Sequence, residues 1–369
     1  MTTAKRLLCF IAATMLFIPV TVFCQSERKQ LDSLLMNTKI EAFPILSYDT
    51  DVGFGYGLKI FFLNQLRRHE SFDVTAFNST KGERWYRFVF SIPDFELRQG
   101  RAYRRAFDLI IDYDKYLKNN FFGIGSTSRS EDRETYIKEP LDIMGVLSRA
   151  FTPRLVGQIA IKYKTVDNID YSENGLFTNT LAPINRGRSS ALSLVASLRH
   201  DSRDSYINAT KGHLLQEEVE VANKKIGSDY GIASAVLSLQ FYKEVIAPQM
   251  ILAVRWISQV IDGSDLPIHS LASLGGSRTL RGYPQDRFLD QVMMLTNAEL
   301  RFPIYWRFGG LVFLDAGKVW NKVAQVDLQR WPVNAGAGLR LYFDTFVVRA
   351  DVGVSNESVG FYLNFGQLF

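Results

Sequence analysis

The sequence predicts an all-β protein, a 16-stranded antiparallel β-barrel of the bacterial outer membrane preceded by a secretory leader. Aromatic residues are abundant, with 27 Phe, 16 Tyr and 5 Trp in 369 residues. After residue 24 no stretch approaches the roughly 20 apolar residues of a transmembrane helix. Successive segments alternate apolar and polar residues with a period of two, and only a closed barrel of strands leaves no backbone group unsatisfied in lipid.

The first 24 residues have the parts of a signal peptide. Lys5 and Arg6 form a charged start, Leu7–Val22 an apolar core, and cleavage is expected after Cys24. A lipoprotein signal at Cys24 is the alternative, but the large Phe23 argues against it. Both cysteines, Cys9 and Cys24, lie in this leader, so we expect no disulfide and no thiolate metal site in the mature chain.

Three regions are predicted: signal peptide 1–24, a short periplasmic segment 25–40, and a barrel 41–369. In the second region Leu31, Leu34, Leu35 and Thr38 have helical spacing. It could form an amphipathic helix in the barrel mouth or be disordered.

Alternation is clearest in the C-terminal third. Apolar Val333, Ala335 and Ala337 interleave with Asn334, and similar runs follow to Phe369. A soluble sandwich also alternates, but here the polar face is rich in Arg, Glu, Asp and Gly while the apolar face continues strand after strand. The predicted strands are Phe43–Tyr48, Gly53–Leu63, Ser71–Asn78, Arg84–Pro93, Arg101–Tyr113, Arg133–Ala150, Arg154–Asp170, Arg188–His200, Gly212–Ala222, Tyr230–Glu244, Gln249–Ile261, 292–302, 312–316, 333–343, 346–354 and 361–369.

The lengths of the connections give an orientation. Long polar connections alternate with tight turns, and outer-membrane barrels have long loops outside and short turns on the periplasmic side. The predicted outer loops are Lys115–Asp132, Tyr171–Gly187, Asp262–Asp290 and Val319–Arg330; the predicted inner turns include Phe151–Pro153, Val245–Pro248 and Ile304–Trp306.

Four motifs carry a family resemblance. The longest outer loop contains Leu274-Gly275-Gly276-Ser277 followed by Leu280-Arg281-Gly282-Tyr283. Asn297–Pro303 (NAELRFP) and Phe313–Trp320 (FLDAGKVW) come next, and Asp201–Asp204 with Lys211-Gly212 lies upstream. In this order, over about Pro44 to Phe369, the chain resembles the barrel of the BamA/TamA/FhaC superfamily, the bacterial surface antigen family.

The resemblance implies several expectations. The terminal aromatic residues Phe365 and Phe369 are similar to the signal by which such barrels are recognised, so outer-membrane insertion machinery and membrane lipids are expected partners. Family members that insert or secrete proteins usually carry soluble periplasmic repeats. Gln25 to about Ile40 is too short for one repeat, so a separately encoded periplasmic partner could supply that role.

The Arg281 loop is the candidate site. Gly275, Gly276 and Gly282 permit turns that other residues resist, and the planar guanidinium of Arg281 suits carboxylates. By alternation Asp315 and Glu299 point into the lumen. The resemblance implies that the loop folds into the lumen and that Arg281 meets one of these carboxylates. The alternative is a solvated loop arginine.

The sequence gives little indication of catalysis or of metal, phosphate or nucleic-acid binding. The four histidines lack ligand spacing, no Ser-His-carboxylate arrangement stands out, and no helix follows the glycines of Gly53–Gly57. Basic residues are dispersed, although the formal charge is +5, so no nucleic-acid partner is expected. We therefore expect no catalytic residue, metal or cofactor.

Three functions remain. The leading hypothesis is a non-enzymatic accessory in assembly or translocation of proteins or lipids at the outer membrane. A passive pore or solute channel is the alternative, and a long loop in the lumen would occlude it. A barrel enzyme such as a lipid hydrolase is disfavoured because no triad stands out.

Overall fold

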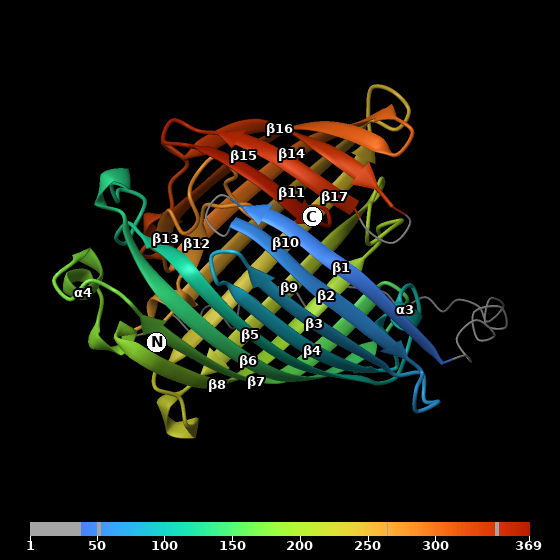
Figure 1. Ribbon diagram of the computed structural model, residues 1–369, viewed down its shortest axis with the longest axis horizontal. Coiled ribbons are helices and arrows are strands. Elements are labelled where there is room, and N and C mark those ends of the chain that lie inside the picture. Colours follow the sequence, from blue (N-terminus) through green and yellow to red (C-terminus); the bar gives the residue numbers. More distant parts are fainter. Residues whose placement is uncertain (1–37, 50–52, 264, 344–346) are drawn as a thin grey trace.

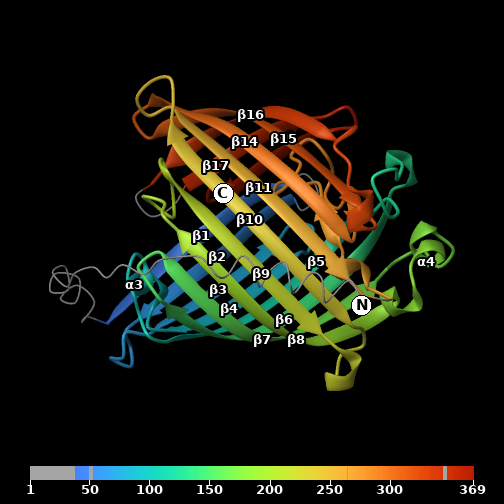
Figure 2. The same ribbon diagram turned by 180° about the vertical axis from the view of Figure 1, so that it is seen from behind.

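Sixteen strands close into an antiparallel barrel in the computed structural model of the protein (Figures 1 and 2). The structure describes residues 38–49, 53–263, 265–343 and 347–369. Each strand pairs with its sequence neighbour, except that β11 pairs with β14, because β12 and β13 form a separate hairpin between them. The barrel and its strand number confirm the predicted fold class. The predicted leader and nearly all of the helix suggested around Leu31–Thr38 lie outside the described residues.

The elements have the following bounds. The barrel strands are β1 Lys39–Asp49, β2 Gly53–Leu63, β3 Ser71–Ser79, β4 Arg84–Ile92, β5 Ala106–Phe121, β6 Glu134–Ala150, β7 Leu155–Ile169, β8 Gly187–Asp201, β9 Gly212–Ala222, β10 Ile232–Glu244, β11 Ile251–Asp262, β14 Val292–Tyr305, β15 Phe308–Trp320, β16 Val333–Tyr342, β17 Val347–Val354 and β18 Val359–Phe365. The hairpin is β12 Ala272–Leu274 and β13 Phe288–Asp290. Short helices are α3 Phe95–Arg98, α4 Leu176–Thr180, η1 Ser130–Asp132, η2 Pro183–Asn185, η3 Lys224–Ile226, η4 Ile268–Ser270 and η5 Val323–Gln325.

The two faces of the wall have opposite chemistry. On β15, Val312 and Leu314 are half exposed on the outside, whereas Phe313 and Asp315 between them are buried. The same alternation recurs around the barrel, where large apolar side chains such as Leu147, Ile159 and Leu194 are exposed. An apolar outer surface and a polar interior are the arrangement of a transmembrane barrel.

The two ends of the barrel differ. The hairpin β12–β13 and α4 lie at one end, and α3 lies at the other (Figures 1 and 2). The connection that carries the hairpin, residues 263–291, follows β11. We call the end with α3 the α3 end; the orientation prediction assigns it to the periplasm.

The contact between β1 and β18 is much shorter than the other contacts of the wall. Among the described residues, only Tyr48 with Leu363 and Asp49 with Tyr362 are paired there, whereas all of β1 from Lys39 onward pairs with β2. We call this contact the seam. The stretch from Lys39 to Ser47 therefore has no partner in the described part of β18.

Several predicted element boundaries differ from the structure, most of all those of the fifth strand. The strand predicted at Arg101–Tyr113 is β5, which begins at Ala106 and continues to Phe121, with an irregular register between Tyr116 and Asn119. Its last part carries polar residues on both faces, such as Lys115 and Asn120, so no period-two apolar signal marks it. Before it, the unpredicted helix α3 is capped by Asp94, whose carboxylate accepts from the backbone N–H of Glu96.

The long loop and the last strand also differ from prediction. The predicted loop Asp262–Asp290 contains the hairpin β12–β13, which pairs Ala272 with Asp290. Strand β18 ends at Phe365, so the prediction that Phe369 continues its outward alternation is wrong. Gly366, with a φ of +83°, turns the chain away from the wall.

Candidate functional site

Glycines shape the loop that presents Arg281. Gly275 and Gly276 follow β12 with φ of +120° and +80°, a region that residues with a Cβ rarely adopt. A Cβ on Gly275 would lie 2.0 Å from the carbonyl oxygen of Pro284. The adjoining Leu274 and Leu280 are fully buried in one apolar cluster with Leu295 and Val319 of the wall. The loop is thereby held against the inner faces of β14 and β15.

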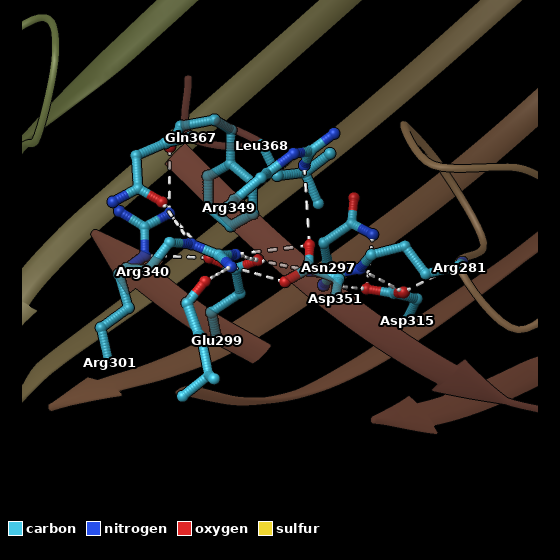
Figure 3. A network of polar contacts seen from close by, with 12 residues as sticks. Arg281, Asn297, Glu299, Arg301, Asp315, Arg340, Arg349, Asp351, Gln367 and Leu368 are labelled. Atoms are coloured by element: carbon cyan, nitrogen blue, oxygen red, sulfur yellow. Dashed lines mark hydrogen bonds and ion pairs between the residues drawn. The ribbon is translucent and has the colours of Figure 1, made fainter. Parts of the chain in front are cut away.

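The Arg281 side chain is completely buried and makes a two-pronged contact with Asp315 (Figure 3). Its Nε lies 3.0 Å from Oδ2 and its Nη2 2.8 Å from Oδ1. Its Nη1 donates to Glu299 Oε1 at 2.6 Å and lies 3.4 Å from Asp351 Oδ2. The guanidinium also stacks 3.4 Å from the ring centroid of Phe313. The structure thus brings Arg281 to both carboxylates named from sequence.

The register of three strands positions Asp315. Asn297 of β14 and Asn334 of β16 are its Cα partners on either side. Their amide groups donate to its two carboxylate oxygens at 2.7 and 2.9 Å. The sheet therefore supplies Asp315 with two side-chain donors, one from each asparagine, and the loop adds two more from Arg281. Such charge-assisted hydrogen bonds are stronger than neutral ones.

A wider set of charges surrounds Glu299. Arg301 donates to it from Nε at 2.9 Å, and Arg340 Nη2 lies 3.9 Å away. Arg340 also pairs with Asp351 at 2.5 Å. We call Arg281, Glu299, Arg301, Asp315, Arg340 and Asp351 the lumenal charge network.

Electrostatics keep Arg281 charged. Burial opposes its charge, but the hydrogen bonds to Asp315 and the attraction of Asp315, Glu299 and Asp351 outweigh burial and raise the pKa of the guanidinium above its ordinary value. Because Arg281 and Asp315 are both buried ions, removal of one side chain would leave the charge of the other poorly solvated.

The rest of the motif is also held in place. Gly282 lies so close to the wall that a Cβ would be 2.6 Å from Asn334, and its carbonyl oxygen accepts from the hydroxyls of Ser355 and Ser358 at 2.8 and 2.7 Å. The Tyr283 hydroxyl donates to Asn356 at 2.9 Å. The motif therefore joins the loop to the connection between β17 and β18, next to the seam.

The two terminal aromatic residues face different surroundings. Phe365 ends β18 and is half exposed. After Gly366 the chain turns inward, and the ring of Phe369 packs 6.2 Å from that of Tyr242 on β10. Arg255 of β11 stacks 5.1 Å from the Phe369 ring. We call Gly366–Phe369 the terminal tail.

Polar contacts tie the terminal tail to the lumenal charge network. Gln367 accepts from Arg340 Nε at 2.9 Å, and the Phe369 carbonyl accepts from Arg301 at 3.0 Å. Arg340 and Asp351 occupy alternating polar positions of the predicted strands 333–343 and 346–354, but the site predicted from sequence does not include them. Their alternation with apolar residues was the available signal, but it could not show that they meet Arg281.

A family model described as the Omp85 superfamily domain matches residues 64–369. The chain belongs to the Omp85 superfamily. This membership confirms the resemblance drawn from the motifs, and it identifies this Omp85 barrel as a protein of the bacterial outer membrane.

Solved structures share the fold of this Omp85 barrel. BamA from Haemophilus ducreyi lacking POTRA domains 1–3 is 15% identical with a TM-score of 0.66, over 89% of this chain and 69% of that one. CdiB from Escherichia coli is 12% identical with a TM-score of 0.62, and CdiB from Acinetobacter baumannii is 14% identical with a TM-score of 0.53. Each match covers 89% of this chain, but only 61% and 59% of the respective CdiB chains. No curated protein matches the sequence.

The histidines of this Omp85 barrel lie apart from the Arg281 loop motif. His269 of η4 is hydrogen-bonded through Nε2 to the Tyr230 hydroxyl at 3.2 Å, and the rings of His200 and His213 stack 5.2 Å apart. Within the described ranges, no group of three or more His, Cys, Asp or Glu could hold a metal ion. The described helices are all too short or too polar to cross a membrane.

Proposed function

We propose that this Omp85 barrel is a non-enzymatic accessory in assembly or translocation of proteins or lipids at the outer membrane, and that it acts at its seam. Membership in the Omp85 superfamily supports the general role. The observation that carries the proposal is the contact between β1 and β18, in which two residue pairs are formed among the described residues while Lys39–Ser47 has no partner in β18.

An unpaired strand edge has a distinct chemistry in a membrane. From Lys39 to Ser47 the side of β1 toward β18 presents backbone groups that no described strand pairs. In hydrocarbon each unsatisfied backbone group costs several kcal/mol. An incoming extended segment can satisfy these groups by adding a strand. The seam is therefore the part of the wall at which a client strand is best accommodated.

The site described above borders the seam. The terminal tail leaves β18 at Gly366 and is bound to Arg301 and Arg340, so the residues after Phe365 do not continue along β1. The Gly282 contacts to Ser355 and Ser358 hold the loop to the β17–β18 connection. We propose that these contacts maintain the short seam while the opposite wall stays fully paired.

A reversible disulfide across the seam, called the seam lock, tests the proposal. Tyr48 and Leu363 are Cα partners across the seam, so Tyr48→Cys with Leu363→Cys would form a disulfide in a predicted mature chain that otherwise has no cysteine. The matched control joins Leu339→Cys with Ala350→Cys across the fully paired β16–β17 contact. The assay follows how fast a small denatured β-barrel client becomes protease-resistant in vesicles containing each protein.

We expect the wild type and the control lock to accelerate client insertion and the oxidised seam lock to lose that acceleration, with recovery on reduction. Equal acceleration by the oxidised seam lock would overturn the role of the seam. Vesicles that pass small solutes without accelerating any client would instead favour the passive pore.

A further inference from the structure

Arginines gather at the α3 end of the barrel. They lie at Arg149 near the end of β6 and in the segments 64–70, 93–105 and 151–154, which connect β2 to β3, β4 to β5 and β6 to β7. Because β2 to β7 are consecutive neighbours in the wall, these segments form one continuous arc along the rim. We call its members the arginine arc: Arg67, Arg68, Arg101, Arg104, Arg105, Arg149 and Arg154, all exposed or half exposed.

The acidic residues of the same segments are engaged elsewhere. Glu70 is buried and accepts from the backbone N–H groups of Leu66 and Arg68. Asp94 caps α3, and Glu96 accepts from the Tyr206 hydroxyl at 2.7 Å. No ion pair joins the arginine arc to a carboxylate among the described residues, whereas the neighbouring Arg98 is paired with Asp108 at 2.5 Å.

The opposite end of the same strands is balanced. The connection between β5 and β6 places Arg129 against Glu131 at 2.7 Å, and residues 80–83 hold one lysine and one glutamate. The excess of positive charge is therefore a property of the α3 end under β2–β7. Because the described residues offer these arginines no carboxylate partner, their guanidinium groups are free to bind an external anion.

Apolar side chains lie between the arginines. Leu66 is 61% exposed, Phe95 44% and Phe151 54%. The guanidinium of Arg149 stacks 5.2 Å from the Phe151 ring. Two residues before Arg149, the lipid-facing Leu147 is also exposed. Cations and aromatic rings interleaved where the apolar wall ends are the composition of a membrane interface, and this favours lipid over a soluble acidic protein.

We propose that the arginine arc binds the phosphate groups of anionic phospholipids in the adjacent leaflet. Guanidinium groups donate two parallel hydrogen bonds to a phosphate, while Leu66, Phe95 and Phe151 contact the acyl region beside it. The proposal rests on the outer-membrane location and not on any role of the seam, so the two can fail independently.

Neutralising the centre of the arc tests this. The variant combines Arg101→Gln, Arg104→Gln and Arg105→Gln. A matched control removes three exposed charges at the opposite end, with Lys224→Gln, Lys225→Gln and Lys322→Gln. Purified proteins in neutral detergent are titrated with phosphatidylglycerol or phosphatidylcholine, and bound lipid is counted by native mass spectrometry.

We expect phosphatidylglycerol, and not phosphatidylcholine, to bind the wild type and the control. A surface cation contributes enough attraction that the triple variant should bind phosphatidylglycerol at least about tenfold more weakly. High salt should reduce wild-type binding, because exposed charges are screened.

A charge-preserving variant with lysine at the same three positions should retain most of the binding. Heat-modifiable migration verifies that each variant is folded, and if the glutamine triple does not fold, Arg104→Gln with Arg105→Gln replaces it. Equal phosphatidylglycerol binding by the folded glutamine variant and the wild type would overturn the proposal. So would an equal loss in the lysine-neutralised control.

Discussion

Replacing Arg281 with alanine should destabilise the barrel by about 3 kcal/mol. The side chain is wholly buried and contacts Asp315 at 2.8 and 3.0 Å and Glu299 at 2.6 Å. Breaking a buried ion pair by removing one partner typically costs about 3–5 kcal/mol. Asp315 keeps two amide donors, and Glu299 keeps Arg301, so the lower end of the range is expected.

The structure also predicts that the effects of replacing Arg281 and Asp315 on stability are strongly coupled. Asp315→Ala should cost a similar amount, because Arg281 would then be left with an incomplete set of partners. The double variant should be little worse than either single variant. Arg281→Lys should be intermediate, because an ammonium keeps the charge but cannot reproduce the planar fork.

Urea unfolding in lipid vesicles, followed by tryptophan fluorescence, measures these free energies, and limited proteolysis of residues 265–290 reports on the loop. Arg278→Ala is the matched control, since Arg278 lies on the same loop and is exposed. Additive effects of the two single variants would show that Arg281 and Asp315 are not coupled, and the reasoning would then fail.

Three further predictions concern the loop, the terminal tail and the orientation. Burial and the nearby Lys164 and Lys138 lower the pKa of His269 well below 6.5. The folded protein therefore excludes a proton that the unfolded chain takes up, and stability should fall as the pH drops below about 6.5. The difference between the urea midpoints at pH 7.5 and 5.5 should shrink in His269→Gln, and an unchanged difference would contradict this. Gly366→Ala places a Cβ at a φ of +83° and should cost about 1–2 kcal/mol, seen as faster proteolysis of the terminal tail, whereas Gly145→Ala, at an extended position on β6, should not accelerate it. A cysteine at Trp306, between β14 and β15, should resist a membrane-impermeant thiol reagent in intact cells, and labelling there would refute the predicted orientation.

The role of the terminal aromatic residues in membrane insertion stays a prediction. Phe365→Ala should slow assembly, measured as delayed appearance of the heat-modifiable form. Phe369→Ala should mainly weaken packing against Tyr242, because the ring lies on the inner side of the wall. Equal delays in Phe365→Ala and Phe369→Ala would contradict the expectation that recognition during assembly depends on Phe365, at the end of β18, more than on Phe369.

The sequence by itself determined the class of fold and the number of strands, whereas the pairing of Arg281 with an inward carboxylate was what the family resemblance implied. A period of two assigns each residue to one face of a sheet, and lipid outside makes that assignment visible as hydrophobicity. Asp315 and Glu299 could therefore be placed on the inner face before the structure, and the glycines around Arg281 indicated a loop able to turn back.

Only the tertiary structure decided which groups meet across the interior. Asp351 and Arg340 were on predicted inner faces, but barrel curvature and register determine that they contact Arg281 and Glu299. The polar end of β5 and the inward turn at Gly366 lack a lipid-facing pattern, so alternation could not reveal them. The short seam depends on where β18 stops relative to β1, a register between the first and last strands that local sequence does not encode.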